Sequence, residues 1–252
     1  MPKRQERLPP SARKVALLSV LALAGYGLWR LFIGRLLPST AASNLVPQGL
    51  SVAFGALACA LFFYWLARMR YARGVLHGQR SLAAAALAAL GLAAAAACLQ
   101  WGRAPAPLDA ATALPRAAGL AGVLCASAAE EYGFRGSLFR SLQELGGRSG
   151  TALALAAGSL GFALLHWGYQ GTWVLPFAAA AGLALGVARL RGAPLAALVA
   201  AHALMDGVDA AWLSPSLSQG YWTSVAAAVA ALAVAALLAL LPKAPPPALP
   251  RS

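Results

Sequence analysis

The chain has 252 residues and a formal net charge of +13, yet 60% of its residues are hydrophobic and only 11% are charged, for a mean hydropathy of +0.68. This composition excludes a water-soluble globular domain and predicts an integral, multi-pass membrane protein. The positive charge does not predict nucleic-acid binding, because the Lys and Arg residues lie between apolar runs instead of forming a basic stripe interleaved with aromatic residues.

Eight apolar segments come close to the length of about 20 residues that a helix needs to cross a bilayer. They are residues 15–37, 47–67, 82–101, 117–142, 151–168, 172–190, 194–213 and 221–241. They predict an all-α fold, a polytopic transmembrane bundle of about eight helices that forms a single domain over residues 15–241. Residues 1–14 are a predicted basic cytoplasmic tail, and residues 242–252 a predicted flexible, proline-rich tail. Gly182 and Gly186 form a GxxxG pattern, which we interpret as a helix-packing site.

The basic residues test this layout, because Lys and Arg concentrate in the cytoplasmic loops of membrane proteins. With these eight spans, 16 of the 20 Lys and Arg residues fall on one face, which includes both ends of the chain. The other face holds Arg30, Arg35, Arg103 and Arg116. Both termini are therefore predicted to be cytoplasmic. The composition, rich in Ala, Leu, Gly and Arg, is typical of a bacterium of high genomic GC content, which predicts the bacterial inner membrane as the location.

Ionisable residues inside the apolar segments are candidates for function, because a charged side chain at the middle of a bilayer costs about 3 kcal/mol or more. They are Glu130, Glu131, Arg135, His166, His202, Asp206 and Asp209. Residues four apart share a helix face, so three pairs are predicted to be in contact: Glu131 with Arg135, Phe162 with His166, and His202 with Asp206. In an α-helix, Glu130 points about 100° away from Glu131 and has no cation on its own helix. Asp209 is assigned no role.

These residues form three motifs in chain order. Glu130 to Arg135 read as EExxxR, Phe162 to His166 as FxxxH, and His202 to Asp206 as HxxxD. The ordered set resembles the signature of the CAAX-protease and bacteriocin-processing family, the Abi-type intramembrane glutamic endopeptidases, over residues 117–213. The resemblance implies a protein-processing hydrolase that cleaves a membrane-embedded or lipid-anchored protein or peptide in the bilayer, without a metal, a cofactor or a covalent intermediate.

The resemblance also implies roles for the matched residues. Glu130 removes a proton from water, His166 holds and polarises that water, and His202 stabilises the oxyanion. Several family members carry Asn at the last motif position; because an ionised Asp206 can only accept hydrogen bonds, we assign it the orientation of His202. Three further residues are assigned structural or orienting roles: Glu131, Arg135 and Phe162.

The depth of the three motifs sets a condition on this site. Glu130 and His202 are each predicted to lie about 15 Å from the cytoplasmic loops, whereas His166 is sixteen residues past Gly150. A shared site therefore requires the helix of His166 to start outside the membrane, to tilt, or to break near Gly158 and Gly161.

Two other functions are compatible with the same residues. Two His and one Glu are also the ligand set of a zinc-dependent membrane peptidase, although no HExxH motif is present in the sequence. Intramembrane Glu and His also occur in proton relays, so a non-catalytic protein, either a proton-coupled transporter or an immunity-type protein, is the alternative of another class. For a peptidase, the substrate classes left open are a prenylated protein, a bacteriocin leader and a C-terminal sorting segment.

Overall fold

The computed structural model describes residues 10–38, 42–71, 81–99, 110–170, 172–212 and 221–242, and the regular elements in these ranges are all helices. Residues 1–9 and 243–252 of the two predicted tails lie outside the described residues, whereas residues 12–14 of the first belong to α1. The α-helices are α1 (Ala12–Leu36), α2 (Leu45–Tyr71), α3 (Leu82–Leu99), α4 (Ala110–Glu130), α5 (Phe139–Leu145), α6 (Gly150–Gln170), α7 (Leu175–Leu190), α8 (Leu195–Trp212) and α9 (Tyr221–Leu240).

The prediction of an all-α, polytopic bundle is confirmed. A π-helical segment, η3 (Glu131–Leu138), joins α4 to α5, so these three elements form one rod. Within the described ranges, seven helices are long and apolar enough to cross a membrane, and the apolar part of α8 is shorter, from Leu195 to Val208. The largest difference from the predicted spans is in α4, which begins at Ala110 and continues through Pro115, whereas the uncharged apolar run begins only after Arg116.

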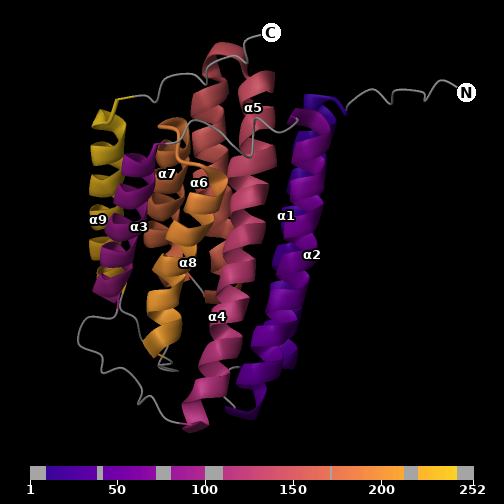
Figure 1. Cartoon of the computed structure of the whole chain (residues 1–252), viewed down its shortest axis with the longest axis vertical. Coiled ribbons are helices and arrows are strands. Elements are labelled where there is room, and N and C mark those ends of the chain that lie inside the picture. The colour runs from indigo at the N-terminus through magenta and orange to yellow at the C-terminus, as the bar shows by residue number, and fades with distance from the viewer. Residues whose placement is uncertain are drawn as a thin grey trace, which may run out of the picture.

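The helices stand side by side, with α1 beginning and α9 ending at the same end of the bundle (Figure 1). Two hydrogen bonds join neighbouring segments at this end. Ser81 N, just before α3, donates to the Gly192 carbonyl at 3.1 Å, and the Arg191 guanidinium donates to the Ala239 carbonyl of α9. We call it the basic end, because the described basic residues there are Arg13, Lys14, Arg68, Arg70, Arg140, Arg189 and Arg191. The placement of these residues agrees with the alternation in the sequence. That this end is cytoplasmic stays a prediction.

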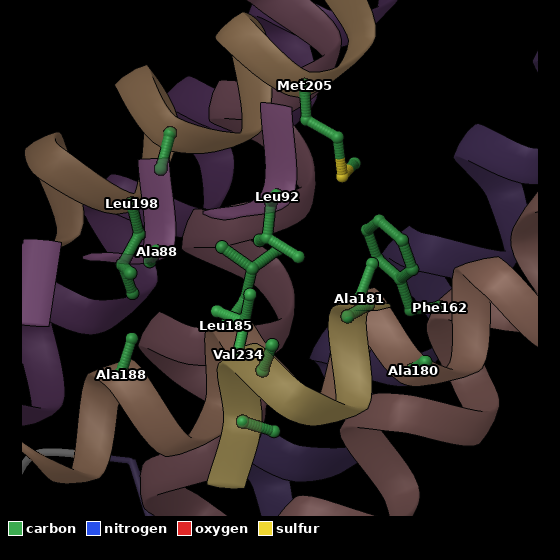
Figure 2. Close-up of a cluster of buried hydrophobic side chains, with 14 of the residues drawn as sticks. Ala88, Leu92, Phe162, Ala180, Ala181, Leu185, Ala188, Leu198, Met205 and Val234 are labelled. Carbon is green, nitrogen blue, oxygen red and sulfur yellow. The ribbon is translucent and has the colours of Figure 1, made fainter. Parts of the chain in front are cut away.

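Small residues form most of the core shared by α3, α6, α7, α8 and α9. Figure 2 shows Leu92 of α3, Leu185 of α7 and Val234 of α9 meeting between helices that also contribute many alanines. Alanine side chains let helix backbones approach closely, which matters in lipid, where packing replaces the hydrophobic effect as the force that joins helices. A second cluster of Tyr26, Ala56, Ala60, Ala126 and Ala129 joins α1, α2 and α4.

The GxxxG pattern of α7 is a packing site, as predicted. A Cβ atom added at Gly182 would lie 3.0 Å from Ser159 Cα and 3.3 Å from Phe162 Cβ on α6, and one added at Gly186 would lie 2.8 Å from Leu155 Cδ2. The absence of side chains at these two positions thus allows α6, which carries the FxxxH motif, to contact the backbone of α7.

Gly182→Ala is therefore expected to destabilise the protein by about 1–3 kcal/mol, since the added methyl group pushes α6 away from α7. Gly158→Ala on α6 is the matched control, because no heavy atom lies within 4 Å of a Cβ atom there. Unfolding of the purified variants in detergent, followed by circular dichroism, compares the two. Equal stability of the two variants would contradict the assigned role of Gly182.

Candidate active site

The three sequence motifs meet in the interior of the bundle. Glu130, His166 and His202 are each at most 4% exposed, and one nitrogen or oxygen atom of each lies within 4.8 Å of the others. The helix of His166 does not break to reach them, because α6 is continuous from Gly150 to Gln170. The predicted convergence of the motifs is therefore found without a break near Gly158 and Gly161, which was one of three alternatives for reaching a shared site.

The EExxxR motif lies at the start of the π-helix. Eight residues, Glu131 to Leu138, have the wider π-helical hydrogen bonding, which in other proteins often occurs at functional sites. Hydroxyl groups support the segment: Ser137 Oγ donates to the Gly133 carbonyl at 3.2 Å and accepts from Ser19 Oγ of α1 at 2.7 Å. The sequence analysis treated this segment as an α-helix. The sequence signal for a departure from the α-helix is the presence of Gly133 and Gly136, since glycine is a poor helix former.

The predicted pair of Glu131 and Arg135 is present and fully buried. Glu131 Oε1 accepts from Arg135 Nη1 at 2.8 Å, and Arg135 Nη2 donates to the Gly182 carbonyl of α7 at 2.9 Å. The guanidinium also lies over the ring of Phe162, with its central carbon 4.8 Å from the ring centroid. Such additional contacts are what make a buried ion pair tolerable, because they compensate for lost hydration.

His202 is contacted by both carboxylates of the EExxxR motif, through its two different nitrogens. Nδ1 lies 3.0 Å from Glu131 Oε1 at hydrogen-bond geometry, whereas Nε2 lies 3.9 Å from Glu130 Oε2. Asp206 is near, as predicted, with Oδ2 at 3.4 Å, but it approaches Nε2. Glu131 is therefore the carboxylate that accepts a hydrogen bond from His202 Nδ1. The prediction that Asp206 orients His202 in this way is wrong, because Asp206 approaches Nε2.

Phe162 packs against both imidazoles. Its ring centroid lies 4.4 Å from that of His166 and 5.1 Å from that of His202. The predicted contact of Phe162 with His166 is therefore present. His166 Nδ1 lies 2.9 Å from the Phe162 carbonyl oxygen, so in the neutral imidazole Nδ1 donates and the lone pair is on Nε2.

Arg30 of α1 is the site residue that the sequence analysis missed. Its Nη1 donates to Glu130 Oε1 at 3.2 Å, so Glu130 has a cation from another helix. The sequence places Arg30 within the predicted span 15–37, near the non-cytoplasmic face, and Arg30 was given no role in the site. The signal that could have found it is its position as a charged residue inside an apolar segment, followed by the apolar run Leu31–Gly34.

The charges of the described cluster nearly balance. Three carboxylates (Glu130, Glu131 and Asp206) face two guanidinium groups (Arg30 and Arg135), and a protonated His202 would complete the balance. The side chain of Asp209 lies outside the described residues.

The same cluster offers the ligand types of a catalytic zinc ion. Glu130, His166 and His202 supply one carboxylate and two imidazoles, and the hydrogen bonds of both Nδ1 atoms resemble those that orient metal-bound histidines. Arg30 opposes a metal ion here, because its guanidinium already contacts the Glu130 carboxylate and would repel a divalent cation.

Residues 112–208 match the family model described as type II CAAX prenyl endopeptidase Rce1-like. This segment, which is less than half of the chain, is similar to the Rce1-like family. The Rce1-like segment contains all three motifs, on α4, η3, α6 and α8, whereas α1 to α3 and α9 lie outside it. No curated protein and no solved structure matches the chain. The match supports a membrane endopeptidase of the CAAX type and confirms the family resemblance seen in the sequence.

Proposed function

We propose that this protein is an intramembrane glutamic endopeptidase that cleaves a membrane-associated protein or peptide precursor with a water nucleophile. The observation that carries the proposal is the buried group of Glu130, His166 and His202, with polar atoms within 4.8 Å of one another in an Rce1-like segment. A triangle of that size suits one water molecule hydrogen-bonded to all three groups at about 2.8 Å.

In this mechanism Glu130 is the general base and His166 orients the water. Glu130 Oε2 removes one water proton as the oxygen attacks the scissile carbonyl carbon, while His166 Nε2 accepts a hydrogen bond from the other. When the tetrahedral intermediate breaks down, the amine leaves with the proton that Glu130 took. Water is the nucleophile, so no covalent enzyme intermediate forms.

His202 stabilises the oxyanion through Nε2. Its Nδ1–H donates to Glu131 at 3.0 Å, which fixes the ring. In the imidazolium form Nε2 carries a second proton, which can be donated to the developing negative charge. Asp206, 3.4 Å from the same nitrogen, favours the imidazolium form by its charge. Glu131 thus orients His202, Arg135 holds Glu131, and Phe162 packs the two imidazoles in place.

The proposed substrate is a membrane-embedded or lipid-anchored chain, and the proposed location is a bacterial inner membrane. The name of the matched family refers to prenylated proteins with a C-terminal CaaX sequence. A bacteriocin leader and a C-terminal sorting segment are the other substrate classes that suit a site buried among membrane-spanning helices.

Terminal-peptide profiling by mass spectrometry tests the proposed function and does not require the substrate to be known. Membranes from cells that express the wild-type protein are compared with membranes from cells that express Glu130→Gln at equal abundance. We expect new protein termini only with the wild type. Identical sets of termini would exclude proteolysis and favour a transporter or an immunity-type protein.

The zinc peptidase is kept as a second candidate, because the ligand set and the two Nδ1 hydrogen bonds fit it. Metal analysis of the purified active protein and incubation with a chelator separate the two. For the glutamic peptidase, processing continues after chelation and does not depend on added zinc.

A further inference from the structure

Arg30 holds one oxygen of the carboxylate that we assign as the general base. It lies on α1, outside the segment that matches the family, and its Nη1 is 3.2 Å from Glu130 Oε1. The other oxygen, Oε2, accepts no hydrogen bond among the described residues and faces His202 Nε2 at 3.9 Å. The carboxylate is therefore anchored at one oxygen and presents the other to the imidazoles.

The two arginines of the cluster are held differently. Arg135 is completely buried and makes short contacts to both Glu131 and the backbone of α7. The Arg30 side chain is 17% exposed, and its guanidinium carbon lies 5.9 Å from the ring centroid of Tyr26, one turn earlier on α1. Arg135 therefore serves the packing of the bundle, whereas Arg30 lies at the edge of the cluster, with its charge directed at Glu130.

We propose that Arg30 is a positioning residue for hydrolysis, which fixes the rotation of the Glu130 carboxylate so that Oε2 faces the attacking water. The inference rests on the proposed function. It means that the catalytic machinery extends beyond the family segment to α1. Without Arg30 the carboxylate is free to rotate, and misplacing a reacting atom by about 1 Å costs about 100-fold in rate.

Kinetics of three variants test this role, with a quenched fluorescent, prenylated peptide that ends in a CaaX sequence as the probe. Arg30→Gln is expected to lower kcat by about 100-fold with KM within about two-fold, and Arg30→Lys to restore part of kcat because it keeps a point charge. Arg35→Gln, an exposed position on the same helix, is the control with wild-type rates. A raised KM with unchanged kcat, or equal loss in Arg30→Gln and Arg30→Lys, would overturn the proposal.

A stability cycle separates failure of this inference from failure of the proposed function, since it needs no substrate. Melting temperatures are measured for Arg30→Gln, Glu130→Gln and the double variant. Because each single change leaves the partner without its ion pair, we expect the double variant to melt no lower than the worse single variant. Additive losses would show that the two side chains are not coupled.

A different observation indicates from which side the cluster is reached. On the helices between the cluster and the basic end, Leu138, Ala184, Leu195 and Leu198 are each at most 6% exposed. The two partly exposed members of the cluster are Arg30, 17% exposed, and Asp206, 29% exposed. Both lie on the side away from the basic end, toward the last turns of α1 and α8.

From this asymmetry we infer that water and substrate reach the cluster from the end of the bundle opposite to the basic end. A carboxylate exposed to lipid tails is strongly disfavoured, so the open side of Asp206 faces water or lipid headgroups. If the basic end is cytoplasmic, as the loop charges predict, the scissile bond is presented at the non-cytoplasmic side of the membrane. The substrate class is then a protein or peptide whose cleavage point lies outside its membrane anchor.

Thiol labelling from each side of the membrane tests this access route without a substrate. In a background with the three cysteines Cys59, Cys98 and Cys125 replaced by Ala, single cysteines are placed at Asp206 and, on the same helix outside the catalytic set, at Val208. Arg35→Cys reports the opposite end, and Arg140→Cys, whose native side chain is 57% exposed, reports the basic end. A charged, membrane-impermeant thiol reagent is applied to spheroplasts and to inverted vesicles.

We expect Asp206→Cys and Val208→Cys to react from the same side as Arg35→Cys. Reaction from the side of Arg140→Cys, or no reaction from either side, overturns the inference. Reaction of Arg35→Cys only from the cytoplasmic side would overturn the predicted orientation of the protein and leave the access route within the bundle intact.

Discussion

Glu130→Gln is expected to slow hydrolysis by about 10³-fold or more, near the upper end of what a general base contributes. The amide has the size of the carboxylate but cannot take a proton from water. The amide oxygen can still accept a hydrogen bond from Arg30, whose Nη1 lies 3.2 Å from Glu130 Oε1 in the wild type. The packing of α1 against the rod of α4, η3 and α5 is therefore preserved. The loss is measured as kcat on the peptide probe, with melting temperature and membrane abundance as checks on folding.

Glu144→Gln is the matched control for this change. Glu144 lies on the same rod but at the basic end, where it is partly exposed and pairs with Arg70 at 3.0 Å. Exposed ion pairs of this kind contribute little, so we expect wild-type rates. Retained activity in Glu130→Gln together with normal activity in Glu144→Gln would remove Glu130 from the mechanism, both as the general base and as a zinc ligand.

The fold was predictable because the bilayer restricts what a chain can do. In lipid each backbone polar group must be paired within its own segment, so long apolar runs become helices, and their lengths alone locate them. Residues 47–67 and 221–241 fall almost wholly on α2 and α9 for this reason. The rarity of charge inside membranes then identified Glu130, His166 and His202 as site residues before their proximity was known.

The details that the sequence did not predict depend on contacts between helices. The contact of Arg30 with Glu130 requires α1 to pack against η3, and the residues that cause this packing, such as Ser19 on Ser137, are in no motif. The hydrogen bond of Glu131 to His202 depends on the π-helix. In an α-helix two neighbouring carboxylates point about 100° apart, and that spacing led the sequence analysis to separate their tasks.

These contacts also change the explanation of the paired glutamates. The sequence predicts that Glu130 has no cation on its own helix and that Glu131 is paired with Arg135. In the structure each carboxylate has an arginine, from α1 and from η3, and each faces a different nitrogen of His202. The difference between them is burial of the arginine. The arginine that pairs with Glu131 is fully buried, whereas Arg30, which pairs with the equally buried Glu130, is 17% exposed.

Arg135→Met is expected to destabilise the protein by about 3–5 kcal/mol, the cost of leaving a buried carboxylate without its partner. Three contacts are lost together: the 2.8 Å bond to Glu131, the 2.9 Å bond to the Gly182 carbonyl, and the position over the Phe162 ring. Unfolding in detergent measures the loss. Arg140→Met is the control, expected within about 0.5 kcal/mol of the wild type, because Arg140 is exposed.

A second substitution distinguishes two causes of this loss: the unpaired charge of Glu131 and the missing packing contacts of the Arg135 side chain. Glu131→Gln combined with Arg135→Met removes both charges, while the amide oxygen introduced by the first substitution still accepts a hydrogen bond from His202 Nδ1. We expect this double variant to regain most of the stability lost in Arg135→Met, since replacing a whole buried ion pair is often close to neutral. If the double variant is as unstable as Arg135→Met, the bond to α7 and the contact with Phe162 are what the arginine supplies. The ion pair would then be secondary to helix packing.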